Sequence, residues 1–120
     1  MGSPVLQWQI VTKDPEGTAR FMEELFDWKV QANNALGYRA VDTCSETGIG
    51  GGIWPAPPGT SAFVQLFIEV EDIAATVKRA TARGAKVIVS PQVLPDGDEM
   101  AVLQGPDGLS FGLMRSAREE

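Results

Sequence analysis

The chain contains no histidine, the side chain that most often acts as a general base. The candidate reactive side chains are therefore sought among its carboxylates and its one thiol. The absence of histidine excludes a Ser-His-Asp triad, a Cys-His pair, a two-histidine-one-carboxylate iron site and the common catalytic zinc sites. A carboxylate could still serve as a general base, and the candidates for that role are Glu69, Asp98 and Glu99. Carboxylates could also hold Mg²⁺ or Ca²⁺, but no group of Asp and Glu has the spacing of a known loop such as the EF-hand.

Two other features suggest a reactive site or a phosphate site, and each lacks an essential part. Cys44 is the single cysteine, so it has no internal disulfide partner, and no histidine is present to deprotonate it. We interpret it as a bystander thiol. The glycine-rich run Gly48–Ile53 does not form a phosphate-binding motif. Ile53 stands where the pattern Gly-x-Gly-x-x-Gly needs its last glycine, and no lysine of the Walker type follows. Strand glycines of this kind mark a bulge or a close backbone approach.

The composition places these groups in one small globular domain. The chain has 120 residues, of which 43% are hydrophobic and 22% are charged. A domain of this size and composition can fold around an ordinary apolar core without a disulfide or a structural metal. A net charge of −6 argues against nucleic acid as a partner. No apolar stretch approaches the ~18 residues of a membrane helix, and Met1–Pro4 lacks a signal pattern. We therefore expect a cytoplasmic protein with no membrane partner.

An internal repeat organises the chain. A shift of 58 positions brings Gln7–Asp14 over Gln65–Asp72, and four of the fourteen positions that begin there are identical (Gln, Ile, Asp and Thr). Each copy runs from an extended segment into an aspartate that can cap a helix, with Pro15 at the first helical position of the first copy. Three short extended runs follow each helix. The sequence thus predicts one domain over residues 1–120, with β-α-β-β-β modules at about 5–54 and 61–114 and a proline-rich linker at 55–60.

Apolar spacing predicts which helix faces are buried. In the first helix the residues with 3-4 spacing are Phe21, Met22, Leu25 and Phe26, and we expect all of them in the core. In the second helix the corresponding residues are Ile73, Val77, Ala80 and Thr81, and Gly84 then provides a left-handed stop. The turn Gly105–Gly108 predicts a β-hairpin between the last two strands.

These features together resemble the vicinal-oxygen-chelate superfamily, which includes glyoxalase I, the extradiol dioxygenases and the bleomycin-resistance proteins. The resemblance covers about Val5 to Met114 and rests on the paired modules and on the phrases at 10–16, 26–30, 68–73 and 105–108. It implies an α+β fold in which the two modules form one curved mixed sheet with the helices on its convex side. It further implies a ligand cavity on the concave side and a homodimer that completes it. The motifs specify the fold and not the chemistry.

Enzymes of this superfamily hold a metal ion on the concave side. The resemblance places their ligand positions at Gln7, at Gln65 and at Gly112, with a fourth within Gly50–Trp54. These positions supply two neutral amides and no charged ligand, and neutral carbonyl oxygens bind divalent metals weakly without a carboxylate or imidazole beside them. We expect no metal and no other cofactor.

Strand alternation then predicts which side chains line the concave side. If Gln7 and Gln65 point into it, the same holds for Gln9, Val11, Phe67, Glu69, Ser110 and Met114. The residues that point toward the helices are then Trp8, Ile10, Leu66, Ile68, Phe111 and Leu113. The predicted ligand-binding residues are Gln7, Gln9, Tyr38, Trp54, Gln65, Phe67, Glu69, Met100, Ser110 and Gly112. Two alternatives stay open at this point: the two amides could bond each other and fill space, and Glu69 could face the surface.

The resulting hypothesis is a metal-independent protein that binds and sequesters a small molecule, as the bleomycin-resistance proteins do. Its ligand would be an apolar or cationic aromatic compound, and we favour a binding protein over an enzyme. The alternative is a lyase or isomerase of the same superfamily in which Glu69, Asp98 or Glu99 is the general base. A third hypothesis, a purely structural interaction module, predicts no ligand cavity.

Overall fold

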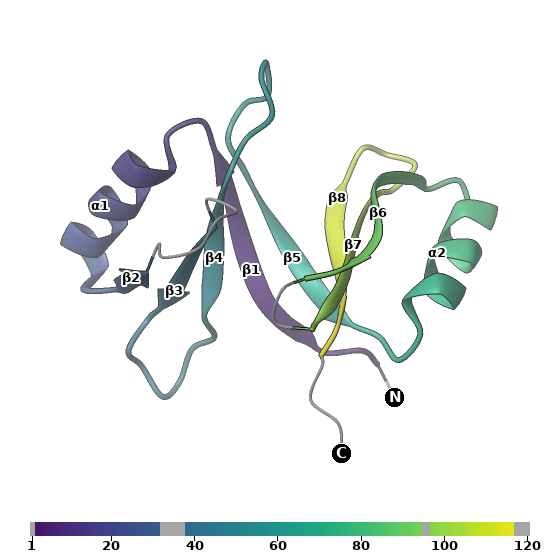
Figure 1. Cartoon of the computed structure of the whole chain (residues 1–120), viewed down its shortest axis with the longest axis horizontal. Coiled ribbons are helices and arrows are strands. Elements are labelled where there is room, and N and C mark those ends of the chain that lie inside the picture. The colour runs from purple at the N-terminus through teal and green to yellow at the C-terminus, as the bar shows by residue number, and fades with distance from the viewer. Residues whose placement is uncertain (1, 32–37, 95–96, 117–120) are drawn as a thin grey trace. The chain divides into compact units, whose positions relative to one another are not determined.

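The computed structural model describes residues 2–31, 38–94 and 97–116 (Figure 1). Within these residues the chain forms two helices and eight strands. In chain order they are β1 (Val5–Thr12), α1 (Pro15–Phe26), β2 (Lys29–Gln31), β3 (Arg39–Asp42), β4 (Gly51–Pro55), β5 (Phe63–Glu69), α2 (Ile73–Ala82), β6 (Lys86–Val93), β7 (Glu99–Gln104) and β8 (Ser110–Arg115). The order β-α-β-β-β occurs twice, so the predicted α+β fold class and its repeat are confirmed.

The chain divides into two compact units. One unit is Gln7–Gln65, and the other joins Leu66–Glu120 to the first six residues. The beginning of β1 therefore packs with the second unit. A hydrogen bond of 2.9 Å from the Glu69 amide to the Pro4 carbonyl is one of the contacts that hold it there.

In the first unit the strands lie in the order β2-β3-β4-β1, with β1 parallel to β4 and the other pairs antiparallel. Helix α1 lies against one side of these strands (Figure 1). The core between them consists of Ile10, Ala19, Val41 and Ile53, with Trp8, Met22, Trp28 and Val30 packed around it. The prediction that Trp8 and Ile10 point toward the helix is confirmed.

In the second unit the strands lie in the order β5-β8-β7-β6, with β5 parallel to β8. Helix α2 buries Ile73 against Ala101, Leu103 and Leu113. A second apolar cluster of Phe67, Met100, Val102 and Met114 is formed by residues that alternate with these along the strands, so it lies on the opposite face of the sheet. This unit therefore has an apolar cluster on both faces.

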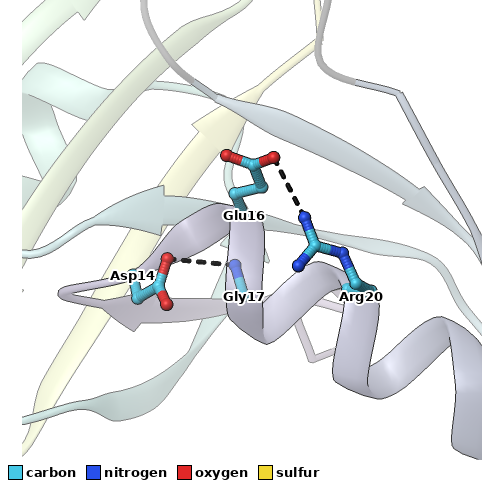
Figure 2. A network of polar contacts seen from close by, with 4 residues as sticks. All are labelled: Asp14, Glu16, Gly17 and Arg20. Atoms are coloured by element: carbon cyan, nitrogen blue, oxygen red, sulfur yellow. Dashed lines mark hydrogen bonds and ion pairs between the residues drawn. The ribbon is translucent and has the colours of Figure 1, made fainter.

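The helix starts in the two modules are capped in the same way. Asp14 accepts a hydrogen bond of 3.0 Å from the Gly17 amide at the start of α1, where Glu16 also pairs with Arg20 at 3.0 Å (Figure 2). Asp72 accepts one of 3.0 Å from the Ala75 amide. These contacts satisfy backbone donors that the first turn of a helix leaves free. The predicted caps are confirmed, and neither of the two described helices is long and apolar enough to cross a membrane.

The predicted stops and turns also form. Gly84 follows α2 with a φ of 100°, and Gly108, with a φ of 93°, donates its amide to the Gly105 carbonyl at 3.0 Å in the β7-β8 turn. Such φ values are unstrained for glycine.

The prediction that the apolar face of α1 is fully buried is wrong. Phe21, Leu25 and Phe26 are 61%, 57% and 53% exposed, whereas Ala19 is buried and Met22 is partly buried. Two apolar stripes run along this short helix, and only the stripe that contains Ala19 and Met22 packs on the narrow sheet. Thr81 of α2 is likewise exposed.

Leu66, which was predicted to point toward the helices, is 47% exposed, so it is not part of the core. Strand β6 extends to Val93, and its pairing with β7 shifts register between Val87 and Val89 and again between Val89 and Gln92. Since β6 is the last strand in the order of its unit, Pro91 is tolerated there, and irregular pairing discourages further strands from adding.

Candidate functional site

The face of the first unit opposite α1 carries the residues best placed to bind a ligand. In the parallel β1-β4 pair, Gln9 lies beside Gly52 and Val11 lies beside Trp54. These residues alternate with Ile10 and Ile53, which face α1, so they lie on the other side of the strands. Together with Tyr38 we name them the Trp54 face: Gln9, Val11, Tyr38, Gly52 and Trp54.

Tyr38 belongs to this face because its ring packs on it. The Tyr38 and Trp54 rings have centroids 4.8 Å apart and planes inclined by 41°, a tilted arrangement that aromatic pairs favour. A Cβ atom at position 52 would overlap the Tyr38 ring. A larger residue at position 52 would clash, because the Tyr38 ring occupies the space of its side chain. The close approach to the backbone that we expected at this glycine run is therefore made by the Tyr38 ring.

The adjacent glycine serves the opposite face. A Cβ atom at Gly51 would overlap the Trp8 ring and backbone. The indole Nε1 of Trp8 donates a hydrogen bond of 3.0 Å to the Ile49 carbonyl. The two glycines thus let an aromatic ring lie against each side of β4.

The indole N–H of Trp54 differs from that of Trp8. Its Nε1 atom is buried, and in the described structure no hydrogen-bond acceptor reaches it. Most buried polar groups are hydrogen-bonded, and one without a partner costs about 1–3 kcal/mol. An acceptor on a bound molecule would remove this cost once binding moves the groups that cover the indole edge. Gln9, the neighbouring polar side chain of the Trp54 face, is itself only 4% exposed.

Gln7 and Gln65 also lie in the first unit. Gln65 is 6% exposed and Gln7 is partly buried. Both residues have interaction partners in the structure, so neither is free.

The second unit brings together three of the predicted site residues, but it packs them tightly. Phe67 is 0% exposed and lies beside Gly112 in the β5-β8 register, and a Cβ atom at position 112 would overlap its ring. Met100 joins the same cluster, and Leu6, Val89 and Leu94 pack around it. Ser110 is half-buried at the start of β8, where it pairs with Gln104.

The candidate carboxylates have separate surroundings. Glu69 is partly buried at the end of β5, beside Met114. Glu99 lies 3.8 Å from the Arg115 guanidinium across the β7-β8 pair. The Asp98 carbonyl accepts a hydrogen bond of 2.7 Å from the Leu94 amide. Asp98 and Glu99 thus sit at the start of β7 and Glu69 on a strand separated from it by β8.

The residues at the family's metal positions do not fit a divalent cation. Gln7 and Gln65 offer only neutral amide oxygens, and the ring of Phe67 fills the space that a carboxylate side chain at position 112 would need. Among the described residues, no group of three or more His, Cys, Asp or Glu could hold a metal ion. Neutral amides alone bind such ions weakly. The expectation that the protein works without a metal stays a prediction.

Strand alternation predicted Val11 on the same face as Gln9, which the register of β1 with β4 confirms, but sequence reasoning did not place Gly52 on the Trp54 face. The signal for Gly52 was present in the run of three glycines that ends just before Ile53 and Trp54. No pattern could indicate that Tyr38 fills the space above it, because that contact depends on how β3 pairs with β4.

Comparison with known proteins agrees with this architecture. The model of the Glyoxalase/Bleomycin resistance protein/Dioxygenase superfamily matches residues 5–113. Proteins named "Putative glyoxylase CFP32" from Mycobacterium bovis and Mycobacterium tuberculosis are 32% identical over 72 residues, which is 60% of this chain. The chain spans only 28% of the length of these curated relatives.

Solved structures show the same fold at low sequence identity. A variant of Streptomyces coelicolor methylmalonyl-CoA epimerase with bound 2-nitronate-propionyl-CoA has a TM-score of 0.65 at 16% identity, covering 98% of this chain and 100% of that one. A superfamily member from Vibrio splendidus has a TM-score of 0.65 at 14% identity, covering 95% and 99%. The Mycobacterium tuberculosis methylmalonyl-CoA epimerase has 0.64 at 13%, covering 98% and 89%. The repeated β-α-β-β-β units and the match over residues 5–113 together establish that this chain belongs to the glyoxalase/bleomycin resistance protein/dioxygenase superfamily.

Proposed function

We propose that this protein binds a small molecule on the Trp54 face without a metal ion. The observation that carries the proposal is the buried indole N–H of Trp54, which meets no acceptor among the described residues although its ring is packed against Tyr38. Small-molecule sites are mostly apolar and aromatic, with a few fixed polar groups that orient the ligand. The Trp54 face has this make-up, with Val11 and two aromatic rings beside the Gln9 amide.

The donor chemistry supports a site without metal. Two amides and a glycine replace the ligand set that the superfamily's metal enzymes use, and no carboxylate belongs to the Trp54 face. The protein's charge of −6 attracts cations and repels anions at long range. A neutral or cationic aromatic compound is the ligand class that these features favour.

A second candidate function is supported by the solved structures that share this fold, several of which are methylmalonyl-CoA epimerases. In that case the chain would be an isomerase or lyase that uses a carboxylate base. Glu69 is better placed for this role than Glu99, because Glu99 faces the Arg115 guanidinium. The low sequence identity of these structures supports only the fold, so we rank this function second.

Calorimetry and a fragment screen test whether binding is independent of metal ions. We expect titrations with Mn²⁺, Ni²⁺ and Zn²⁺ to give no heat of micromolar, one-to-one binding. We also expect aromatic fragments to raise the melting temperature equally with and without EDTA. One tight metal site per chain, or fragment binding that EDTA abolishes, would contradict the proposal and favour the metal enzymes of the superfamily.

A further inference from the structure

We infer that the ligand of the Trp54 face carries an uncharged oxygen acceptor, such as a ketone or amide carbonyl, which binds the indole N–H of Trp54. This inference rests on the proposed function and specifies the chemistry of its ligand. It makes Trp54 the residue that selects among aromatic compounds of similar shape.

The direction of the hydrogen bond follows from the chemistry of indole. An indole N–H can only donate, so a hydroxyl or amine proton on a ligand cannot satisfy it and an acceptor can. The buried Nε1 of Trp54 meets no such acceptor in the described structure, whereas the Nε1 of Trp8 has the Ile49 carbonyl at 3.0 Å. Trp8 and Trp54, two of the three tryptophans of this unit, thus differ in that one indole N–H has its acceptor and the other meets none among the described residues.

The charge of the acceptor follows from the residues around it. The five residues of the Trp54 face carry no formal charge, so a carboxylate or phosphate bound there would lose its water without meeting a cation on that face. The negative charge of the whole chain adds to this penalty. A carbonyl oxygen accepts the indole N–H with a much smaller loss of hydration.

The shape of the ligand follows from the aromatic pair. Tyr38 and Trp54 are partly buried and their rings are inclined by 41°, whereas Val11 beside Trp54 is only 6% exposed. A planar aromatic body would therefore pack on the two rings and bring a carbonyl substituent to the indole edge. The ligand class is therefore an uncharged aromatic ketone or amide.

Two probes of matched shape test the inference: 2-acetylnaphthalene, which has a carbonyl, and 2-isopropenylnaphthalene, which replaces the oxygen with a methylene group. Binding is measured by titration of the ¹⁵N-labelled protein in EDTA, with the three indole N–H signals assigned by single Trp→Phe variants. We expect the ketone to bind about threefold to tenfold more tightly and to shift the Trp54 indole signal. In Trp54→Phe we expect the two probes to bind equally.

The control variant is Trp8→Phe, which removes an indole N–H that already has a partner and lies on the α1 side. We expect it to keep the preference for the ketone. Equal binding of both probes to the wild-type protein would overturn this inference while leaving the Trp54 face as a ligand site. No shift of any Trp54-face signal by either probe would overturn the proposed function, and the inference with it.

Discussion

The two modules use the sheet face away from their helix in different ways. In the β1-β4 pair Gln9 lies beside Gly52 and Val11 beside Trp54, and in the β5-β8 pair Phe67 lies beside Gly112 and Glu69 beside Met114. Both strand pairs therefore have a glycine at the equivalent position of the register, Gly52 and Gly112. The neighbouring side chains differ, because Phe67 takes the place of Gln9 and Met114 takes the place of Trp54.

This difference distinguishes the residue types on the two faces. In the second module Phe67 covers Gly112 and is fully buried with Met100 and Met114. In the first module a ring from outside the strand pair, Tyr38, covers Gly52, and the face also holds the buried Gln9 amide and the indole of Trp54. We propose that the polar groups of the first module serve ligand binding and that the apolar cluster of the second serves stability.

The largest expected effect comes from emptying the packed face. Phe67→Ala should lower the free energy of unfolding by about 3–5 kcal/mol, because it leaves a large cavity among buried side chains. The corresponding change in the first module, Gln9→Ala, should cost less than about 1.5 kcal/mol. Urea denaturation of both variants measures the contrast, and equal losses would show that the two faces are packed alike.

Adding a methyl group at the repeated glycine sharpens the comparison. Gly112→Ala should cost about 1–3 kcal/mol, because the added Cβ overlaps the ring of Phe67, which is fully buried and has little room to move. Gly52→Ala should cost less, because Tyr38 is only partly buried. Thermal unfolding of the pair checks the order, and a larger loss for Gly52→Ala would contradict it.

The helix caps should behave alike in both modules. Asp14→Ala and Asp72→Ala each remove one side-chain acceptor from a helix start, and each should cost about 1 kcal/mol. Asp→Asn variants at the same positions keep the acceptor and serve as controls. If only one of the two caps mattered for the unfolding free energy, the repeat would not extend to the helix starts.

The smallest expected effect on the free energy of unfolding distinguishes Trp8 from Trp54. Trp8→Phe leaves the Ile49 carbonyl without its donor and should cost about 1 kcal/mol more than Trp54→Phe, which removes a donor that has no partner. Chemical denaturation followed by circular dichroism measures both variants without relying on tryptophan fluorescence. A greater loss for Trp54→Phe would mean that its indole N–H is already satisfied.

Local chemistry made much of the fold predictable. Asp14 and Asp72 cap helices, Gly108 closes a turn, and Trp8 and Ile10 alternate with Gln9 along β1, because each of these features depends on residues close together in the sequence. The buried side of α1 was not predictable in the same way. A helical period groups Phe21 with Leu25 and Ala19 with Met22, but only the packing on the sheet decides which group is buried.

The candidate site was predicted in its residue types and not in its arrangement. Alternation identified Gln9, and Trp54 was recognised as an aromatic near the expected site. The missing information was the strand register, which brings the Tyr38 ring over Gly52 and beside Trp54. Such contacts join residues far apart in the chain, and single-sequence patterns do not contain them.

The most direct test of a binding face confined to the first module is a map of ligand-induced shifts in a protein labelled on its tryptophan and glutamine nitrogens and methionine methyl groups. With an aromatic ketone in EDTA, the account predicts shifts of the Trp54 indole and Gln9 amide signals, while the methyl signals of Met100 and Met114 stay in place. Shifts of those methyl signals with the Trp54 indole unmoved, or binding only after a divalent metal is added, would contradict it.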